Sequence, residues 1–134
     1  YKKKLGKIPK FAVTGLNPHC ESNFINSEEK RIIIPAIKRA QKKNIIIKGP
    51  FSADTMFIKN NLRKYDVVIG MYHDQVLTPI KTLYNFNAIN ITLGLPFLRI
   101  SPDHGPNNQM LGKKKSDPTS LIEALLFIKK FDEN

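Results

Sequence analysis

The sequence has 134 residues, of which 41% are hydrophobic and 25% are charged, and its formal net charge is +11. This length allows one compact domain with a core, and the composition excludes an intrinsically disordered chain. No apolar run approaches the roughly 20 residues that a membrane-spanning helix needs. The single cysteine, Cys20, excludes an internal disulfide framework and fits the reducing cytoplasm.

The excess of lysine would suit nucleic acid, an anionic membrane or a phosphorylated small molecule. The lysines are spread along the chain, mostly in segments expected to be solvated helix faces or loops. The sequence has no basic recognition helix and no aromatic stacking platform for RNA bases. We therefore expect a phosphorylated small-molecule substrate, no nucleic acid and no membrane, with a basic nucleic-acid-binding module kept as an alternative.

The first part of the chain alternates strand and helix signals. Residues 11–13 predict a short strand that ends at a Thr-Gly pair. Asn26 is placed to cap a helix, with Glu29 in the capping-box position, and this helix should end near Asn44. Pro35 lies inside the helix and should kink it. The apolar face of the helix is expected to consist of Ile33, Ile37 and Ala40.

Further elements follow in the middle of the chain. Residues 45–47 predict a buried strand that ends at Gly49-Pro50, and residues 54–62 predict a short helix. Residues 67–69 form a second β-branched run with turn signals on both sides, as expected of a buried parallel strand.

The last part of the chain predicts a strand over residues 88–93, a loop over residues 101–118 and a final helix. Asp117 is the expected cap of that helix, and Pro118 suits its first position. The apolar face is expected to consist of Leu121, Ala124, Leu125 and Ile128. Strands that alternate with helices indicate an α/β fold with a mostly parallel sheet, in which chemistry belongs just past the strand ends.

Polar side chains cluster at those predicted strand ends. Taken singly, each has an ordinary structural explanation as a loop histidine, a helix cap or an ion-pair partner. The sequence has no local metal-binding motif and no glycine-rich phosphate loop. The residues alone therefore support only a small-molecule site at the strand ends. The side chains concerned are His19, Asp54, His73, Asp74, Arg99 and His104.

Taken together, four segments resemble the C-terminal half of the 4-hydroxythreonine-4-phosphate dehydrogenase family, which serves vitamin B6 synthesis. The resemblance extends from about residue 10 to residue 128. It implies an isocitrate-dehydrogenase-like α/β/α architecture, with residues 1–134 as the C-terminal part of a two-domain subunit. They would contribute to two α/β subdomains with a crossover near residues 70–90, and the N-terminal half is expected to be absent. The four segments are VTGLNPH, GPFSADTMF, VVIGMYHDQ and NITLGLPFLRISPDHG.

The resemblance implies a divalent metal (Zn, Mg, Mn or Co) held by three histidines. Two of these match His19 and His73, and the third is expected in the N-terminal half. Asp54 and Asp74 match acidic positions near the metal and are the expected catalytic residues. Asp74 would orient a metal ligand or relay a proton. His104 matches a residue of the loop on the cofactor side.

The residues that contact substrate in the family match Lys81, Asn90 and Arg99. The family oxidises 4-phosphohydroxy-L-threonine by hydride transfer to NAD (or NADP), and the keto acid then loses carbon dioxide. A metal with open coordination positions would lower the pKa of the substrate hydroxyl. Lys81 and Arg99 would hold the phosphate, and Asn90 would add a neutral donor and acceptor.

The resemblance therefore predicts an NAD-dependent oxidoreductase of pyridoxal phosphate biosynthesis, cytoplasmic and homodimeric, with active sites shared between two subunits. A chain that carries two of three metal ligands is expected to be inactive alone. One alternative is a related dehydrogenase that acts on another four-carbon hydroxy acid phosphate. Another is a non-catalytic fragment that only dimerises.

Overall fold

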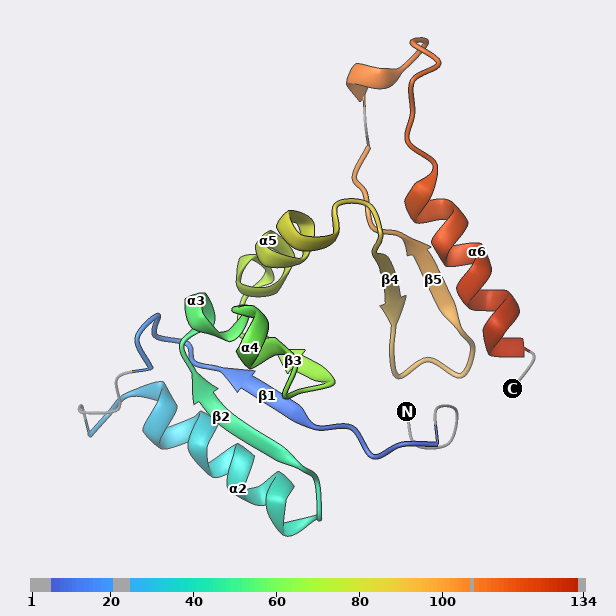
Figure 1. The fold of residues 1–134 in the computed structure, drawn as a ribbon. Coiled ribbons are helices and arrows are strands. Elements are labelled where there is room, and N and C mark those ends of the chain that lie inside the picture. Colours follow the sequence, from blue (N-terminus) through green and yellow to red (C-terminus); the bar gives the residue numbers. More distant parts are fainter. Residues whose placement is uncertain (1–5, 21–24, 107, 133–134) are drawn as a thin grey trace. The chain divides into compact units, whose positions relative to one another are not determined.

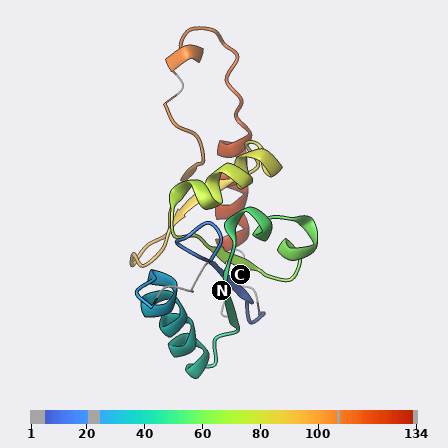
Figure 2. The ribbon, with the colours of Figure 1, turned by 90° about the vertical axis from the view of Figure 1, so that its left-hand side faces the viewer.

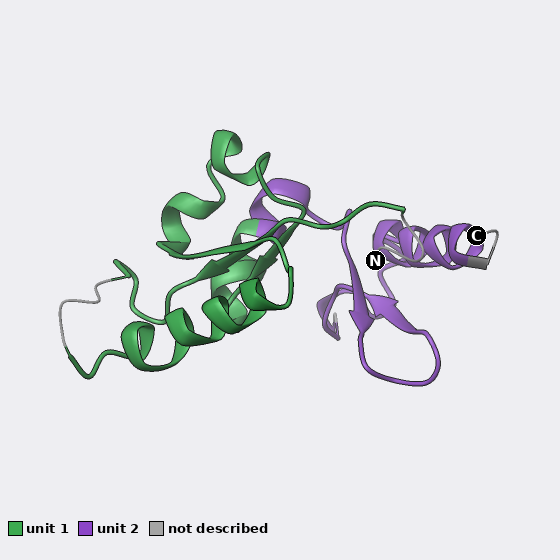
Figure 3. Cartoon of the chain, turned by 90° about the horizontal axis from the view of Figure 1, so that it is seen from below, with its two compact units in different colours: residues 1–79 green, residues 80–134 purple. Residues whose placement is uncertain are grey.

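The computed structural model describes residues 6–20, 25–106 and 108–132. The chain divides into two compact units, residues 1–79 and residues 80–134, which Figure 3 shows in separate colours. The boundary falls inside one helix, α5 (His73–Tyr84), so each unit contains part of it. Over the described ranges, no helix has the length and hydropathy that a bilayer crossing requires.

The first unit is built on a parallel three-stranded sheet. Its strands are β1 (Phe11–Thr14), β2 (Ile47–Phe51) and β3 (Val67–Ile69), in the order β2-β1-β3 (Figure 1). The central strand is the most deeply buried, with Thr14 fully inaccessible. The predictions of strands over residues 11–13 and 67–69, and of a parallel α/β sheet, are confirmed.

The predicted strand over residues 45–47 is wrong in its bounds. β2 begins at Ile47 and continues through Gly49 and Pro50, which the sequence suggested as its end. The pairing of β1 with β2 shifts by one residue at this point, and Gly49 has a φ of +142°. A Cβ at this position would lie 2.5 Å from the carbonyl oxygen of Val13. Glycine therefore permits the close approach of two strands here, and it does not end the strand.

The predicted helix begins as a π-helical turn, η1 (Glu29–Ile33), and continues as α2 (Ile34–Lys42), which packs along β2 (Figure 1). Pro35 lies in the first turn of α2, where its missing N–H is tolerated. The expected disturbance thus takes the form of a π-helical turn just before the proline. Ile33 and Ile37 are buried as predicted, and with Val13 they form the core of this unit.

The predicted cap of this helix is wrong. The hydroxyl of Ser27, and not the side chain of Asn26, accepts a hydrogen bond from the backbone N–H of Lys30, at 3.3 Å. Glu29 does not complete a capping box, because its side chain is buried with 1% exposure and contacts the loop after β1.

The predicted helix over residues 54–62 is two single-turn helices, α3 (Ala53–Met56) and α4 (Lys59–Leu62). The chain is extended at Ile58, with φ −59° and ψ 132°. The carbonyl oxygen of Thr55 accepts from the side chain of Asn61 at 2.9 Å and from the N–H of Ile58 at 3.3 Å, and these bonds connect the two turns. Threonine, isoleucine and asparagine are weak helix formers, which explains why the segment does not stay continuous.

The second unit contains an antiparallel ribbon of β4 (Ile89–Thr92) and β5 (Arg99–Pro102), covered on one face by α6 (Thr119–Asp132). β4 was predicted, whereas β5 was not, and the mostly parallel sheet is found only in the first unit. The segment between β5 and α6 extends away from the ribbon and contains a short 3₁₀ turn, η2 (Asn108–Met110) (Figure 2). The predicted cap of α6 is confirmed, because the Asp117 carboxylate accepts from the N–H of Thr119 at 2.9 Å.

The predicted apolar face of α6 is wrong in most of its members. Ala124 is buried, but Leu121 and Leu125 are 47% and 58% exposed. The face against the ribbon is instead centred on Ser120, which is fully buried. Its hydroxyl donates to the carbonyl oxygen of Ala88 at 2.6 Å, so a polar contact fixes which side of the helix turns inward.

Candidate functional site

The loop after β1 holds His19 in a tight turn. The backbone N–H of Asn17 donates to the buried carboxylate of Glu29 at 2.6 Å. The side-chain oxygen of Asn17 then accepts from the backbone N–H of His19 at 2.9 Å, and its carbonyl oxygen accepts from Cys20 at 3.0 Å. These contacts fix the backbone of the turn and leave the imidazole of His19 exposed.

His73 is the first residue of α5, directly after β3 and a short turn. Its Nδ1 lies 2.9 Å from the Oδ1 of Asp74. When Nδ1 carries the proton, this carboxylate orients the ring and leaves Nε2 as a free ligand atom. Both side chains are exposed, so the pair contributes little to stability and acts mainly on the orientation of the ring.

Asp54 lies in α3, after β2, and its carboxylate accepts from the backbone N–H of Thr55 at 2.7 Å. Burial raises the pKa of the Cys20 thiol above its ordinary value, and the negative charges of Glu29 and Asp54 add to the effect. Asp54 is therefore close enough to the turn at residues 17–20 for its charge to act there. A raised pKa also argues against a thiolate nucleophile at Cys20.

The ligand types in the first unit fit part of a metal site. His19 and His73 both follow strands of one sheet, and imidazole is a ligand that suits Zn, whereas carboxylate and water suit Mg and Mn better. Within residues 6–20, 25–106 and 108–132, no three His, Cys, Asp or Glu side chains gather closely enough to hold a metal ion.

In the second unit, Asn90 and Arg99 lie on the same face of the ribbon. Asn90 pairs with Ser101 and Thr92 pairs with Arg99, and residues two apart on a strand share a face. Nη1 of Arg99 donates to the hydroxyl of Thr92 at 2.7 Å. The opposite face carries Ile89 and packs against α6. The guanidinium and the amide therefore lie on the polar side of the ribbon.

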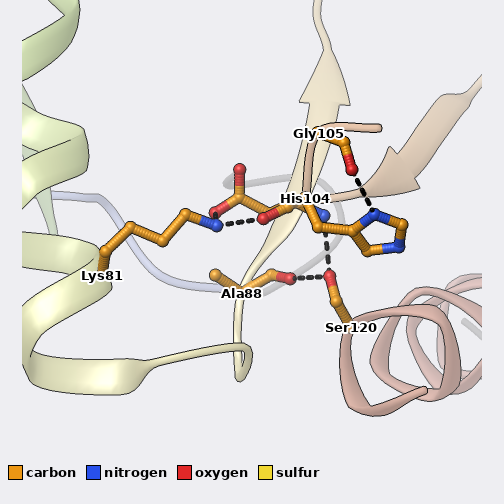
Figure 4. Close-up of polar contacts among 6 residues, drawn as sticks. Lys81, Ala88, His104, Gly105 and Ser120 are labelled. Carbon is orange, nitrogen blue, oxygen red and sulfur yellow. Dashed lines mark hydrogen bonds and ion pairs between the residues drawn. The ribbon is translucent and has the colours of Figure 1, made fainter. Parts of the chain in front are cut away.

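Lys81, on α5, reaches the end of β5 (Figure 4). Its ammonium lies 2.8 Å from the carboxylate of Asp103, donates to the carbonyl oxygen of the same residue, and is 5.7 Å from the ring centroid of Phe86. The N–H of Asp103 donates to the hydroxyl of Ser120 at 2.7 Å. Asp103 and Ser120 thus hold the lysine in place, and no sequence motif singles out either residue for that role.

His104 follows Asp103 in the exposed loop after β5. Its Nδ1 lies 3.2 Å from the carbonyl oxygen of Gly105, the next residue (Figure 4). The assignment of His104 to the loop on the cofactor side stays a prediction.

Comparison with known proteins identifies the family. The sequence profile of the family described as "Pyridoxal phosphate biosynthetic protein PdxA" matches residues 1–128. The chain belongs to this family. The resemblance that the four sequence segments indicated is therefore confirmed at the level of the family.

Relatives in the family are much longer than this chain. A 4-hydroxythreonine-4-phosphate dehydrogenase of Sulfurihydrogenibium sp. (strain YO3AOP1) is 48% identical over 127 residues, which are 93% of this chain and 39% of the relative. The enzyme of the same name from Bradyrhizobium diazoefficiens is 49% identical over 118 residues, 87% of this chain and 34% of the relative. The chain thus spans between about a third and two fifths of such relatives.

A third relative carries a different substrate name. It is a protein of Oceanobacillus iheyensis to which a D-threonate 4-phosphate dehydrogenase activity is provisionally attributed. This protein is 46% identical over 121 residues, 89% of this chain and 36% of the relative.

Solved structures of the family share the fold of this chain. The 4-hydroxythreonine-4-phosphate dehydrogenase of Klebsiella pneumoniae superposes with a TM-score of 0.76 at 34% identity, and that of Burkholderia phymatum with 0.73 at 37%. In both cases the match covers 96% of this chain and 40% of the other. The chain is therefore an α/β portion of a larger family fold.

Proposed function

We propose that this chain is part of an NAD-dependent, metal-assisted 4-hydroxythreonine-4-phosphate dehydrogenase that works in pyridoxal phosphate biosynthesis. The observation that carries the proposal is that the expected metal ligands lie in the first unit and the expected substrate-binding residues lie in the second. His19 and His73, the expected metal ligands, both follow strands of the parallel sheet. The expected substrate residues Lys81, Asn90 and Arg99 all lie in the second unit.

The metal site is proposed to use the exposed imidazoles of His19 and His73. When bound, a divalent metal such as Zn, Mg, Mn or Co supplies positive charge that lowers the pKa of a coordinated hydroxyl. Asp74, at 2.9 Å from Nδ1 of His73, orients that ring. Asp54 is near enough to the His19 turn to serve as the second acidic residue of the site. We assign proton transfer during oxidation to these two carboxylates.

The substrate phosphate is proposed to bind on the polar side of the second unit. Arg99 offers a planar fork that matches two phosphate oxygens, and Lys81 adds a compact positive charge. Asn90, on the same ribbon face as Arg99, offers both a donor and an acceptor. The remaining positive charges of the chain would favour the approach of an anionic substrate.

The rest of the proposed enzyme lies beyond this portion of the fold. The proposal places the present chain in the C-terminal half of a two-domain, isocitrate-dehydrogenase-like subunit, with each unit contributing to one subdomain. The third metal ligand would come from the other portion, and the residues that bind NAD (or NADP) are left open. His104 would lie in the loop beside the cofactor. The complete enzyme is proposed to be a cytoplasmic homodimer with shared active sites.

A second candidate is a dehydrogenase of another four-carbon hydroxy acid phosphate. The 46% identity to the Oceanobacillus iheyensis protein supports it almost as well as the other relatives support the first candidate. Both substrates carry the same phosphate, which Lys81 and Arg99 would bind equally. They differ in the group at the other end, an amino group in one and a hydroxyl in the other.

The test is reduction of NAD by the complete protein that carries this sequence, with 4-phosphohydroxy-L-threonine and with D-threonate 4-phosphate as separate substrates. Each reaction is run with and without added divalent metal. Metal-dependent turnover of 4-phosphohydroxy-L-threonine supports the first candidate, and preference for D-threonate 4-phosphate supports the second. No turnover of either would contradict both. A salt titration against random DNA checks the nucleic-acid alternative, because phosphate contacts give a steep dependence on salt.

A further inference from the structure

The side-chain amide of Gln75, in the first turn of α5, joins two loops of the first unit. Its Nε2 donates to the carbonyl oxygen of Gly15 at 2.8 Å. Its Oε1 accepts from the hydroxyl of Thr14 at 2.7 Å and from the N–H of Met71 at 2.8 Å, with the N–H of Tyr72 at 3.4 Å. One side chain therefore contacts the end of β1 and the turn after β3.

These partners are the backbone segments that lead to the two candidate metal ligands. Gly15 is four residues before His19 and enters the turn that holds it, and Tyr72 immediately precedes His73. Thr14 is fully buried, and Gly15 is buried as well. Because the amide is hydrogen-bonded to both segments, a displacement of one loop would be transmitted to the other.

The contacts require an amide. The side chain must donate a hydrogen bond through one terminal atom and accept hydrogen bonds through the other. Glutamine does both, whereas an ionised glutamate has no donor and methionine has no N–H or O–H donor. A carboxylate would place an oxygen against the carbonyl oxygen of Gly15. A thioether would leave the N–H of Met71 without its acceptor, and the hydroxyl of Thr14 would keep only its longer hydrogen bond, to the carbonyl oxygen of Ile69 at 3.3 Å.

We propose that Gln75 is the positioning residue that sets the separation of His19 and His73 for metal binding. The proposal rests on the metal site of the proposed function. Gln75 does not touch the metal, and its effect comes through the backbone of the two loops. Groups that orient ligands in this indirect way commonly change metal affinity by about 10–100-fold when they are replaced.

The experiment measures the binding of Co²⁺ alone to the complete protein, through the visible absorption of the bound ion. Gln75→Glu and Gln75→Met are compared with the wild type and with Gln41→Met. Gln41 is a matched control because its Nε2 donates to the backbone oxygen of Ile47 at 2.9 Å in the same unit, away from both histidines. Circular dichroism confirms that each variant is folded at the titration temperature. Both Gln75 variants are expected to raise the Co²⁺ dissociation constant by about tenfold or more.

Unchanged Co²⁺ affinity in folded Gln75 variants would overturn the positioning role, and so would an equal loss in Gln41→Met. Thr14→Val provides an independent variant if the Gln75 changes prevent folding, because it removes one partner of the amide and keeps the side-chain shape. It should weaken Co²⁺ binding in the same direction, and full affinity in this variant would count against the proposal. His19→Ala and His73→Ala separate the two levels of the argument, since undiminished Co²⁺ binding by both would remove the metal site itself.

Discussion

The carboxylate of Glu29 is buried at 1% exposure and accepts a hydrogen bond from the backbone N–H of Asn17 at 2.6 Å. This contact joins the start of the helical segment to the loop that presents His19. A carboxylate is costly to bury unless it is hydrogen-bonded, so the loop and the helix stabilise each other. The conformation of the candidate metal-binding turn therefore depends on a residue twelve positions away.

We predict that Glu29→Ala destabilises the protein by about 2 kcal/mol, because it leaves the N–H of Asn17 without its acceptor inside the unit. Glu29→Gln retains an acceptor oxygen and should cost less. Urea-induced unfolding gives the free energies. Glu28→Ala is the control, since this neighbouring glutamate is exposed and its replacement should stay within about 0.5 kcal/mol. Equal effects of Glu29→Ala and Glu28→Ala would show that the buried contact is unimportant.

Sequence patterns predicted the elements whose signals are local. The β-branched run at residues 67–69 and the Asp117 cap of α6 needed no distant partner to be recognised. β5 was missed because Ser101 and Pro102 are typical of turns, and only the pairing with β4 makes them a strand. The burial of Ser120 was missed for the same reason, since its partner Ala88 is 32 residues away.

The candidate site shows the same limit. Motif resemblance selected the residues with reactive groups, such as His73 and Lys81. It did not select Gln75 or Asp103, whose hydrogen bonds to Gly15 and Lys81 cross 60 and 22 residues of sequence. An amide or a carboxylate in a motif has no visible partner until the fold is known. The supporting residues of the site therefore emerge only from the structure.

Ser120→Ala should destabilise the second unit by about 1–3 kcal/mol. The hydroxyl is fully buried, donates to the carbonyl oxygen of Ala88 and accepts from the N–H of Asp103, so its removal leaves two backbone groups unpaired. Urea titration again measures the change. Ser116→Ala, an exposed serine of the preceding loop, is the control and should be close to neutral. A neutral Ser120→Ala variant would contradict the role of this hydroxyl in docking α6.

Arg99→Ala is expected to raise the KM of the complete enzyme for its phosphorylated substrate by at least tenfold, with a smaller effect on kcat. The reason is that the guanidinium fork proposed to bind the phosphate would act equally in the ground state and the transition state. Arg99→Lys should recover part of the loss, because it keeps the charge without the planar geometry. Steady-state kinetics with varied substrate provide the measurement. An unchanged KM in Arg99→Ala would remove Arg99 from the phosphate site.

Thr92→Val tests whether the position of the guanidinium matters. The hydroxyl of Thr92 accepts from Nη1 of Arg99 at 2.7 Å and holds the side chain across the ribbon. Valine keeps the β-branched shape that suits a strand and removes this acceptor. We predict a rise in KM of a few-fold, smaller than that of Arg99→Ala, with unchanged circular dichroism. A KM equal to that of the wild type would mean that Arg99 binds phosphate without help from Thr92.

The ammonium of Lys7, which lies 2.6 Å from the carboxylate of Asp66, holds the pKa of that carboxyl below its usual value, and the backbone N–H of Lys10 adds to the effect at 2.9 Å. A lowered pKa in the folded state means that the unfolded state binds the proton more readily. The contribution to stability is therefore fully present above the unfolded-state pKa of about 3.9, and it is lost as the pH falls through the lower folded-state value.

We predict that Asp66→Asn lowers the free energy of unfolding at pH 7 and flattens its dependence on pH below about 4. Urea unfolding of wild type and variant, measured from about pH 2.5 to about pH 7 so that the range spans the titration of an aspartate, gives the free energy of unfolding as a function of pH for each. High salt should reduce the difference between them, because the side chain of Lys7 is largely exposed. Asp74→Asn is the control, since its carboxylate is exposed and pairs with the exposed ring of the neighbouring His73. Parallel curves for wild type and Asp66→Asn below pH 4 would show that this carboxylate titrates alike in the folded and unfolded chains.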